Sequence, residues 1–405
     1  MANSSPRLPD KRRVIDAINI GVLTKTYPVS RIKAVLKATE RESIRERALP
    51  AHVMVYYVLA LTLWMHTSYA AVLGLLVEGL QWLLSPKEWR MPGKAAISQA
   101  RQRLGWEPLK QLYEEVVQPV AKPGTLGAWY GGRRVVSLDG STLEVADTEA
   151  NEKAFGRPGA SRGTAAYPLL RFVGLVENGT HVLFGAQLGG YRTGETTLAQ
   201  TVVQILCKGM LCLADREFLS YKLWNEARRR GAALLWRGKK NLLLPCYRRL
   251  PDGSYLSFLY ASAKDRRQHR NGVLLRVIEY RLQGVAKKER FYRLVTTLLN
   301  PTQAPAQELA ALYQERWEIE TALDEFKVHL RGARLVLRSK TPDLVRQEFY
   351  GFLLTYFAVR GLMHEAALSV GEDVDRLSFT NAVEVIRRKL YTFCISPLRR
   401  AGAVA

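Results

Sequence analysis

One stretch of the chain carries four side chains of types that bind or act on phosphates, with the spacing Tyr-x2-Arg-x3-Glu-x6-Lys. Tyr313, Arg316, Glu320 and Lys327 lie at offsets of 0, 3, 7 and 14 residues. The pattern around them predicts a helix over residues 306–329, and at about 100° per residue the four fall within about 60° of one another. A solvated charge stripe would look similar, but apolar residues on the opposite side of the helix favour a polar face held toward a specific partner.

Two aspartates follow short apolar runs elsewhere in the chain. Asp139 ends RRVVSLD and Asp215 ends MLCLAD. Each run predicts a strand whose tip brings a carboxylate to one edge of a sheet, although a strand-end aspartate can also simply cap the next turn. With Glu320 these are three carboxylates, enough to hold one or two divalent ions, and hard oxygen ligands suit Mg²⁺ or Mn²⁺. Two such ions about 4 Å apart can activate an attacking water or hydroxyl and stabilise the leaving oxygen in phosphodiester cleavage.

The elements predicted around the two aspartates alternate between strands and helices. A β-branched run over residues 134–138 precedes Asp139. Two apolar runs joined by Asn178-Gly179 predict a hairpin, because this dipeptide suits a tight turn between strands. Helix, strand, helix and strand patterns then follow in TTLAQTVVQIL, MLCLA, FLSYKLWNEARRR and ALLWR. The order strand, hairpin, helix, strand, helix, strand predicts an α/β fold with an RNase H-like core and acidic residues at strand ends.

Composition and periodicity predict four parts in the chain. Helical patterns fill residues 1–121, and a linker rich in Gly and Pro follows over residues 122–132. The RNase H-like domain would span residues 133–367, with a basic β-rich insertion over about residues 238–300, before the helix described above. A helical tail is predicted over residues 368–405.

The chain is strongly basic. Among its 405 residues, 60 Lys and Arg stand against 37 Asp and Glu, which gives a formal net charge of +23. Residues 236–293 carry a net +11 and residues 1–49 a net +6. Such a surface attracts polyanions, either nucleic acid or an anionic membrane face. The hydrophobic content of 47% supplies a packed core, so intrinsic disorder is excluded as the main state.

Export and membrane insertion are not expected. The first residues lack the apolar core of a secretory signal, and the four cysteines form no disulfide framework, so we expect a reduced cytoplasmic setting. Residues 53–77 are apolar over a length that would cross a bilayer. The HTSYAA stretch in their middle supplies a helix start, which favours two buried helices over one membrane span. An integral membrane protein is the less favoured alternative.

A helix predicted from Ser98 begins with polar and basic side chains, among them Arg101 and Arg103. These are the residue types that a recognition helix uses on bases and phosphates. A solvated amphipathic face explains the same pattern equally well, so both interpretations stay open.

The residues described so far resemble the catalytic core of a known family. The Tyr-Arg-Glu-Lys spacing, together with Asp139 and Asp215, is similar to that of the DDE transposases of the insertion sequence four family. Further similar segments are LDGSTLEVADT, AFGRPGASRG, ADREF and LRSKTPDLVRQE. Residues 1–121 resemble the N-terminal domain of that family, so the resemblance covers nearly the whole chain.

The resemblance implies a metal site and DNA contacts beside it. Asp139, Asp215 and Glu320 would be the catalytic residues and would coordinate Mg²⁺ or Mn²⁺, as two ions. Arg237 and Lys239, just after a predicted strand, are similar to contacts with the DNA backbone at the entrance of the insertion. As ordinary surface charges they would need no such role.

The same resemblance implies roles for four residues of the helix predicted over residues 306–329. Tyr313, Arg316 and Lys327 would grip phosphates of the transposon-end strand through charge-assisted bonds. Trp317 looks like the residue that stacks on a flipped base during hairpin formation. A tryptophan of the core is the plain alternative.

The function that the resemblance implies is cut-and-paste DNA transposition through hairpin ends. The helical N-terminal domain would bind terminal inverted repeats, and the core would cut the strands and join them to target DNA. The protein would act as a homodimer on paired ends and would be associated with the nucleoid. No GxxxxGK[ST] loop is present, and transesterification conserves phosphodiester bonds, so no nucleotide cofactor is expected. The alternatives are a catalytically inactive transposase-derived DNA-binding protein and a nuclease that cuts branched DNA without joining strands.

Overall fold

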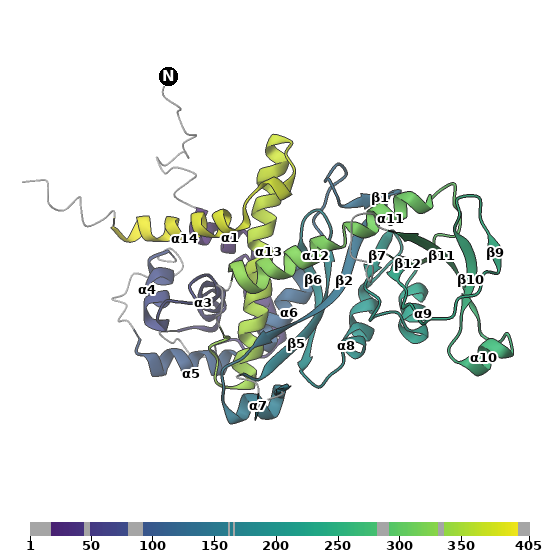
Figure 1. Cartoon of the computed structure of the whole chain (residues 1–405). Helices are drawn as coiled ribbons and strands as arrows, with labels where there is room; N and C mark the ends of the chain where they lie inside the picture. The colour runs from purple at the N-terminus through teal and green to yellow at the C-terminus, as the bar shows by residue number, and fades with distance from the viewer. Residues whose placement is uncertain are drawn as a thin grey trace, which may run out of the picture. The chain divides into compact units, whose positions relative to one another are not determined.

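The structure is a computed structural model, and it describes residues 18–43, 49–79, 92–160, 163–164, 167–281, 291–330 and 336–395. The chain divides into two compact units. The α/β unit comprises residues 119–143 and 155–323, and the helical unit comprises residues 1–118, 144–154 and 324–405. Figure 1 shows the strands of the α/β unit and the helices of the other.

The α/β unit is built on one mixed sheet. In the part of the chain that the structure describes, ten strands form it, in the order β6-β5-β2-β7-β8-β12-β11-β10-β9, with β1 paired to β2. The strands are β1 (Trp129–Tyr130), β2 (Arg133–Glu144), β5 (Leu169–Glu177), β6 (Val182–Gly190), β7 (Met210–Ala214), β8 (Ala233–Arg237), β9 (Arg248–Arg249), β10 (Tyr255–Leu259), β11 (Val273–Arg281) and β12 (Phe291–Thr296). Two further strands, β3 (Gly159–Ala160) and β4 (Gly163–Thr164), form a separate small sheet.

The centre of the sheet is parallel and covered on both faces. β7 pairs in parallel with β2 and with β8, and residues 211–214 are fully buried. Strands buried on both faces are expected to be apolar throughout, which explains the run MLCLA. Helix α11 (Ala306–Gln314) covers one face, where Leu309 and Leu312 share an apolar cluster with Leu213.

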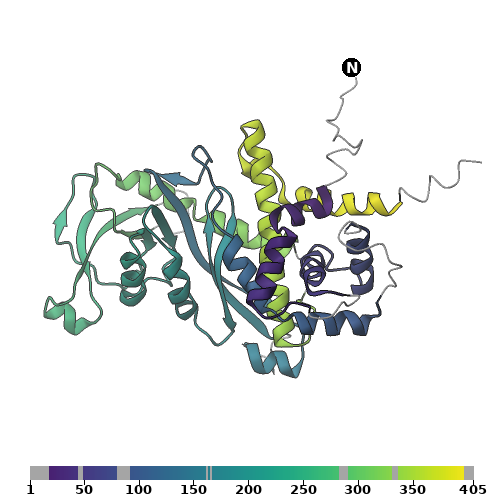
Figure 2. The same cartoon turned by 180° about the vertical axis from the view of Figure 1, so that it is seen from behind.

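Two helices cover the opposite face. They are α8 (Glu195–Val202) and α9 (Tyr221–Arg229), which lie side by side in Figures 1 and 2. Successive residues of a strand point to opposite faces, so Leu235 of β8 joins the cluster under α11 while Trp236 points the other way. There Trp236 meets Trp224 of α9 edge to face, with ring centroids 5.2 Å apart.

The segment predicted as a β-rich insertion contains β9 to β12 and the short helix α10 (Ala263–Arg267). β12 pairs with β8, so these strands continue the main sheet. Arg276 of β11 is fully buried and ion-pairs with Asp252, which also accepts a hydrogen bond from the Ala306 N–H at 2.9 Å. This charged pair ties the insertion to the start of α11.

The hairpin predicted at Asn178-Gly179 is confirmed, with β5 and β6 antiparallel. Its last β5 residue, Glu177, is fully buried. A buried carboxylate requires compensating donors. The donors come from the chain that leads into the sheet and from the turn itself: the N–H groups of Val120 and Ala121, the Thr180 hydroxyl and the Arg134 guanidinium.

The helical unit surrounds one long buried helix, α13 (Pro342–Val370), which packs on α1, α3, α5, α6 and α14. Arg360 of α13 is nearly fully buried and ion-pairs with Glu325. The other helices described in this unit are α1 (Ile18–Thr26), α2 (Val29–Ala38), α3 (Ala51–Leu63), α4 (Tyr69–Gly79), α5 (Lys94–Leu104), α6 (Glu107–Val116), α7 (Glu149–Phe155), η3 (Glu325–Leu330), η4 (Val374–Arg376) and α14 (Phe379–Ile395).

The apolar segment at residues 53–77 forms two helices, as expected. α3 ends at Leu63 and α4 begins at Tyr69. Among the residues that the structure describes, no helix is both long and apolar enough to span a membrane.

The compact units differ from the predicted domains. The predictions put residues 1–121 in one domain and residues 133–367 in another, but residues 144–154 and 324–367 group with the N-terminal helices. The tail predicted from residue 368 begins inside α13. Composition does not reveal this division, because α13 is apolar on most of its surface and gives no sign of the helices that it packs against.

Candidate catalytic site

Asp139 and Asp215 come from neighbouring parallel strands at the same level. Leu138 of β2 is the register partner of Ala214 of β7, so the next residue on each chain segment is an aspartate. Neighbouring strands lie about 5 Å apart, and residues at one level point to the same face. One detail of the prediction was wrong: Asp215 directly follows β7, but β2 continues beyond Asp139 to Glu144.

The helix predicted over residues 306–329 is not continuous. α11 ends at Gln314, and a turn at Glu315 and Arg316 separates it from α12 (Trp317–Asp324). Within the break, Arg316 is turned inward and only 8% exposed. The sequence could not predict this interruption, because none of the residues at the break is Pro or Gly.

Two guanidinium groups lie among the three predicted acids. Arg316 Nη1 is 3.4 Å from Asp139 Oδ2, and its Nη2 is 3.0 Å from Glu320 Oε1. Arg237 Nη1 is 4.0 Å from Asp215 Oδ1. Arg316 therefore links the acid on β2 to the acid on α12, and each of the three acids has a cationic partner.

The environment of Asp139 favours its neutral form. The pKa of this carboxyl is raised from 3.8 to about 6, mainly by burial and to a smaller extent by the nearby Asp215 and Glu195 carboxylates. The Gly140 N–H and the Arg316 guanidinium oppose the shift. Asp139 is therefore a carboxylate whose charge needs a strong cationic partner, which is the property expected of a metal ligand.

The three acids match a divalent metal in chemistry. All three supply hard carboxylate oxygens, the donors that Mg²⁺ and Mn²⁺ prefer. Within the described ranges, no group of three His, Cys, Asp or Glu side chains converges closely enough to hold an ion as it stands. Arg316 instead bonds to two of the acids. The donor set fits a metal, and binding would require these side chains to exchange the guanidinium for the ion.

Tyr313 does not occupy the position predicted for a phosphate ligand. Its side chain is 4% exposed, and its hydroxyl donates a hydrogen bond to the Ala214 carbonyl at 3.2 Å. Burial raises its pKa well above the ordinary value. In this conformation the hydroxyl bonds within the protein, so a phosphate contact would require it to leave the Ala214 carbonyl. Tyr313 holds the end of β7 just before Asp215.

Trp317 and Lys327 lie in different surroundings. Trp317 is 61% exposed, so the interpretation as a core tryptophan is wrong. Lys327 lies in a π-helical segment, Glu325–Leu330, that groups with the helical unit. The regular helical spacing that placed it on one face with Arg316 therefore does not hold in this structure.

The two basic residues predicted at the entrance of the insertion differ in their surroundings. Arg237 stacks on the Tyr292 ring, 4.1 Å from its centroid, and lies beside Asp215. Lys239 is more exposed and ion-pairs with Glu217 at 3.0 Å. Arg237 is thus at the acidic site itself, whereas Lys239 lies on the surface.

One predicted DNA contact in the helical unit is contradicted. Arg101 of α5 is 2% exposed and donates to Gln347 at 2.9 Å and to Ser339 at 3.0 Å. It cannot reach DNA in this conformation, because its guanidinium bonds within the unit. Arg103, two residues later, is exposed.

Two features of the site were not found by sequence reasoning. Glu195 begins α8 and lies against Gly140, where an added Cβ would be 3.0 Å from the Glu195 carboxyl carbon. Nothing in its sequence context points to the site. The other feature is the tip of the β5–β6 hairpin, which contacts the helix break at Glu315. The Asn178-Gly179 dipeptide predicted the turn, but the sequence pattern could not predict that this turn contacts Glu315.

The chain matches the models of two protein families. Residues 17–114 match the family described as "Insertion element 4 transposase N-terminal", and residues 130–358 match the family described as "Transposase DDE domain". Among solved structures, the synaptic complex of piggyBac transposase with hairpin DNA aligns with a TM-score of 0.47 and 11% identity, over 98% of this chain and 84% of that one.

Two curated Escherichia coli K12 proteins are similar in sequence. The transposase InsG of insertion sequence element IS4 is 29% identical over 359 residues, which is 86% of this chain and 78% of InsG. The putative transposase InsZ is 27% identical over 158 residues, 39% of this chain and 51% of InsZ. The DDE domain alone matches more than half of this chain, so the chain belongs to the DDE transposases of the insertion sequence four family.

Proposed function

We propose that this transposase cuts and joins DNA strands at the ends of an insertion sequence with Asp139, Asp215 and Glu320 as its metal ligands and catalytic residues. The observation that carries the proposal is the parallel register of β2 and β7, which puts two aspartates at one level, with Arg316 linking one of them to Glu320. Divalent ions bound there, as two Mg²⁺ or Mn²⁺, would activate the attacking water or hydroxyl and stabilise the leaving oxygen.

The strand order supports an RNase H-like core. β2 lies between the β5–β6 hairpin on one side and the parallel strands β7 and β8 on the other. This is the arrangement expected from the order strand, hairpin, helix, strand, helix, strand. The insertion then adds antiparallel strands beyond β8, and α11 and α12 return the chain to the central strands.

Arg316 has two uses in this proposal. Without metal it neutralises Asp139 and Glu320. If ions held these acids, the guanidinium would be free to bind a phosphate of the DNA end through two parallel hydrogen bonds. Lys327 would grip a second phosphate. The exposed ring of Trp317, next in the chain, would stack on an unpaired base during a hairpin step.

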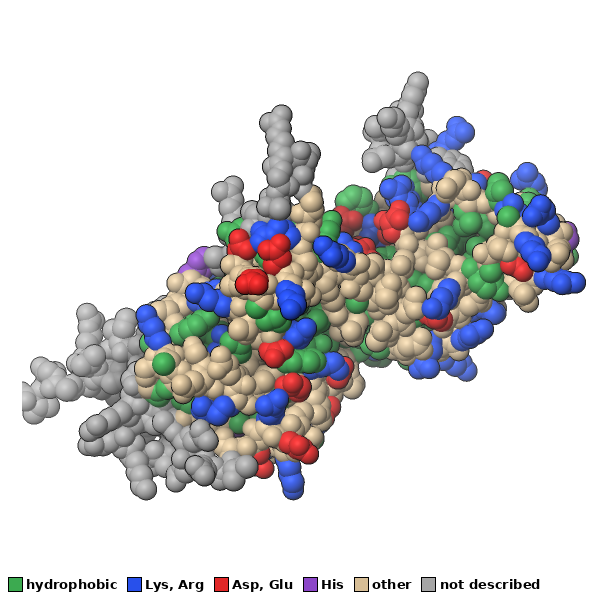
Figure 3. Space-filling view, turned by 90° about the horizontal axis from the view of Figure 1, so that it is seen from below, with side chains coloured by type: hydrophobic (Ala, Val, Ile, Leu, Met, Phe, Trp, Pro, Cys, Tyr) green, Lys and Arg blue, Asp and Glu red, His purple; other side chains and the backbone are tan. Residues whose placement is uncertain are grey.

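The basic surface of the insertion would hold the DNA duplex outside the site. Figure 3 shows many Lys and Arg and few Asp and Glu side chains on the right-hand end of the molecule, where the insertion lies. Arg237 and Lys239 would contact the backbone where the insertion begins. In the helical unit, which would bind terminal repeats, Arg103 remains a proposed contact. A homodimer would hold two ends together before they join target DNA.

Replacing either of two acids tests the assignment of the catalytic residues. Asp139→Ala and Glu320→Ala should lose cleavage of end-containing DNA with Mg²⁺ while still binding that DNA, because each removes a metal ligand. Asp343→Ala, at an exposed side chain of α13, should cleave normally. Gel-based cleavage and strand-transfer assays measure this. Intact cleavage in either of the first two variants would show that the assignment is wrong. A wild-type protein that binds ends without cutting them would be an inactive relic.

The raised pKa of Asp139 predicts how pH affects the metal-free protein. An acid with a raised folded-state pKa stabilises the fold most below its ordinary pKa of 3.8 and loses that stability as pH rises through about 6. Asp139→Asn removes this loss, so it should stabilise the protein near neutral pH by up to about 3 kcal/mol. Near pH 4 the gain should nearly vanish.

Thermal melting with a chelator at both pH values measures this gain. Asp343→Asn provides the control, because it makes the same change at a side chain that is 72% exposed. An equal gain at both pH values for Asp139→Asn would contradict the predicted titration of this carboxyl.

Salt dependence tests whether the insertion binds phosphates. Arg249 and Arg267 are exposed on β9 and α10. If each contacts one phosphate, replacing both with Ala should reduce the slope of log affinity against log salt by about 2, because each contact releases about 0.9 counterion. Fluorescence anisotropy with end-containing DNA gives the slope, and Arg376→Ala, at an exposed residue of the helical unit, is the control. An unchanged slope would place the duplex elsewhere.

A further inference from the structure

The tip of the β5–β6 hairpin joins the strand of one catalytic acid to the helix break beside another. Asn178 is fully buried. Its Oδ1 accepts a hydrogen bond from the Ser137 hydroxyl at 2.8 Å, and its Nδ2 donates to the Glu315 carbonyl at 3.3 Å. One side chain thus holds a residue of β2 with its oxygen and a residue of the turn between α11 and α12 with its nitrogen.

Both partners of Asn178 lie next to residues of the site. Ser137 is two residues before Asp139 on β2, so the two side chains point to the same face of the sheet. Glu315 directly precedes Arg316, which bonds to Asp139 and Glu320. The path from one acid to the other therefore runs through Asn178 as well as through Arg316.

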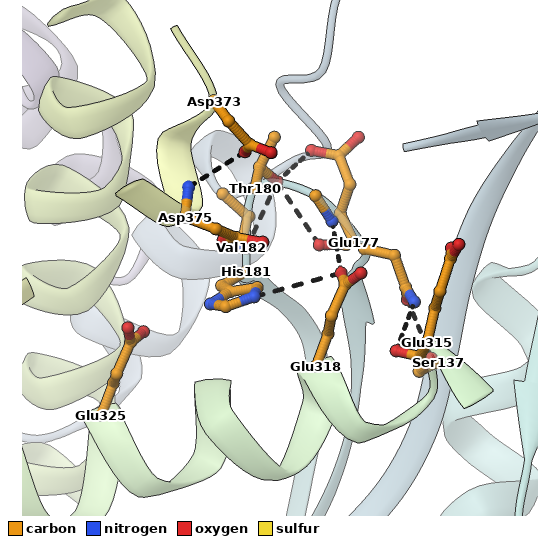
Figure 4. Close-up of polar contacts among 12 residues, drawn as sticks. Ser137, Glu177, Thr180, His181, Val182, Glu315, Glu318, Glu325, Asp373 and Asp375 are labelled. Atoms are coloured by element: carbon orange, nitrogen blue, oxygen red, sulfur yellow. Dashed lines mark hydrogen bonds and ion pairs between the residues drawn. The ribbon is translucent and has the colours of Figure 1, made fainter. Parts of the chain in front are cut away.

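A second contact anchors the same turn to α12. Glu318, in the first turn of that helix, accepts a hydrogen bond from the Gly179 N–H at 2.6 Å, and its Oε2 lies 4.0 Å from Nε2 of the buried His181. Figure 4 shows Glu318 reaching from its helix toward His181. The turn therefore contacts both the break and the first turn of the helix that carries Glu320.

The turn has little freedom to move away. Gly179 has a positive φ of 75°, and a Cβ at this position would lie 2.1 Å from the Leu126 carbonyl oxygen. His181 also has a positive φ, of 58°, which is strained for a residue with a side chain. Backbone strain of this kind persists only where the surrounding structure fixes it. The surroundings therefore fix the position of Asn178.

We infer that Asn178 is a positioning residue that sets the separation between Asp139 and the helix that carries Glu320, and so sets the affinity of the three acids for divalent metal. This inference rests on the proposed metal site. Loss of the side chain would let α12 shift relative to β2. Groups that orient metal ligands from behind typically change metal affinity or activity by about 10–100-fold when they are removed.

A matched residue separates positioning from plain stability. Asn151 is also a fully buried asparagine, and its Nδ2 donates to the Ala146 and Ser339 carbonyls at 2.9 and 3.1 Å in the helical unit. Asn178→Ala and Asn151→Ala each remove two hydrogen bonds from a buried side chain. Both should lower the melting temperature by a similar amount, but only one removes a contact beside the acids.

The test is a titration of the full chain with Mn²⁺ in the absence of DNA, in which electron paramagnetic resonance measures the free ion. We expect Asn178→Ala to weaken Mn²⁺ binding about 10-fold and Asn151→Ala to leave it unchanged. Ser137→Ala, which removes only one of the two hydrogen bonds, should weaken it by less. This milder variant gives the answer if Asn178→Ala does not fold.

Each result has a distinct meaning. Wild-type Mn²⁺ affinity in folded Asn178→Ala, or in Ser137→Ala if the former does not fold, would overturn the positioning role. An equal loss in Asn151→Ala would do the same, since it would make the effect one of general stability. Asp139→Asn in the same titration checks the premise: if it binds Mn²⁺ as the wild type does, the proposed metal site itself has failed.

Discussion

The structure depends on the cost of gathering carboxylates at a partly buried point. Asp139 and Asp215 are placed at one level by the parallel register of β2 and β7, and burial raises the pKa of Asp139, which makes its ionised form more costly than in water. Like charges on neighbouring strands, which lie about 5 Å apart, repel more strongly in a protein than in water. Arg316 compensates by bonding to Asp139 and Glu320. The break between α11 and α12 turns the Arg316 guanidinium inward, so the interruption of the helix places the positive charge that compensates the acids.

The cost of placing these carboxylates together also explains why several elements hold the break between α11 and α12 in position. Tyr313 fastens the end of α11 to β7, and the hairpin turn contacts Glu315 and the first turn of α12. At the other end of α11, the buried pair of Asp252 and Arg276 fixes where the helix begins. These contacts hold a helix in position against a sheet. Their polar groups are buried and bonded, and each would be costly to leave alone.

Much of this could be predicted from local patterns. Apolar runs, an Asn-Gly turn and helical periods predicted the order of strands and helices in the centre of the α/β unit, and two of these runs lead directly into Asp139 and Asp215, whose preceding residues are register partners. The failures share a cause, which is long-range packing. Arg101 has the sequence context of a DNA contact, yet Ser339 and Gln347, more than 200 residues later, bury it. Tyr313 is inside for the same reason.

The Mn²⁺ affinity of Arg316→Gln without DNA tests the proposed metal site most directly, because Arg316 bonds to two of the acids that would hold the ion. Removing a positive charge that bonds to two ligands should tighten Mn²⁺ binding compared with the wild type, while cleavage of end-containing DNA falls because the phosphate contact is lost. Weaker or unchanged Mn²⁺ binding in Arg316→Gln would contradict the account, since the guanidinium would then not compete with the ion for Asp139 and Glu320.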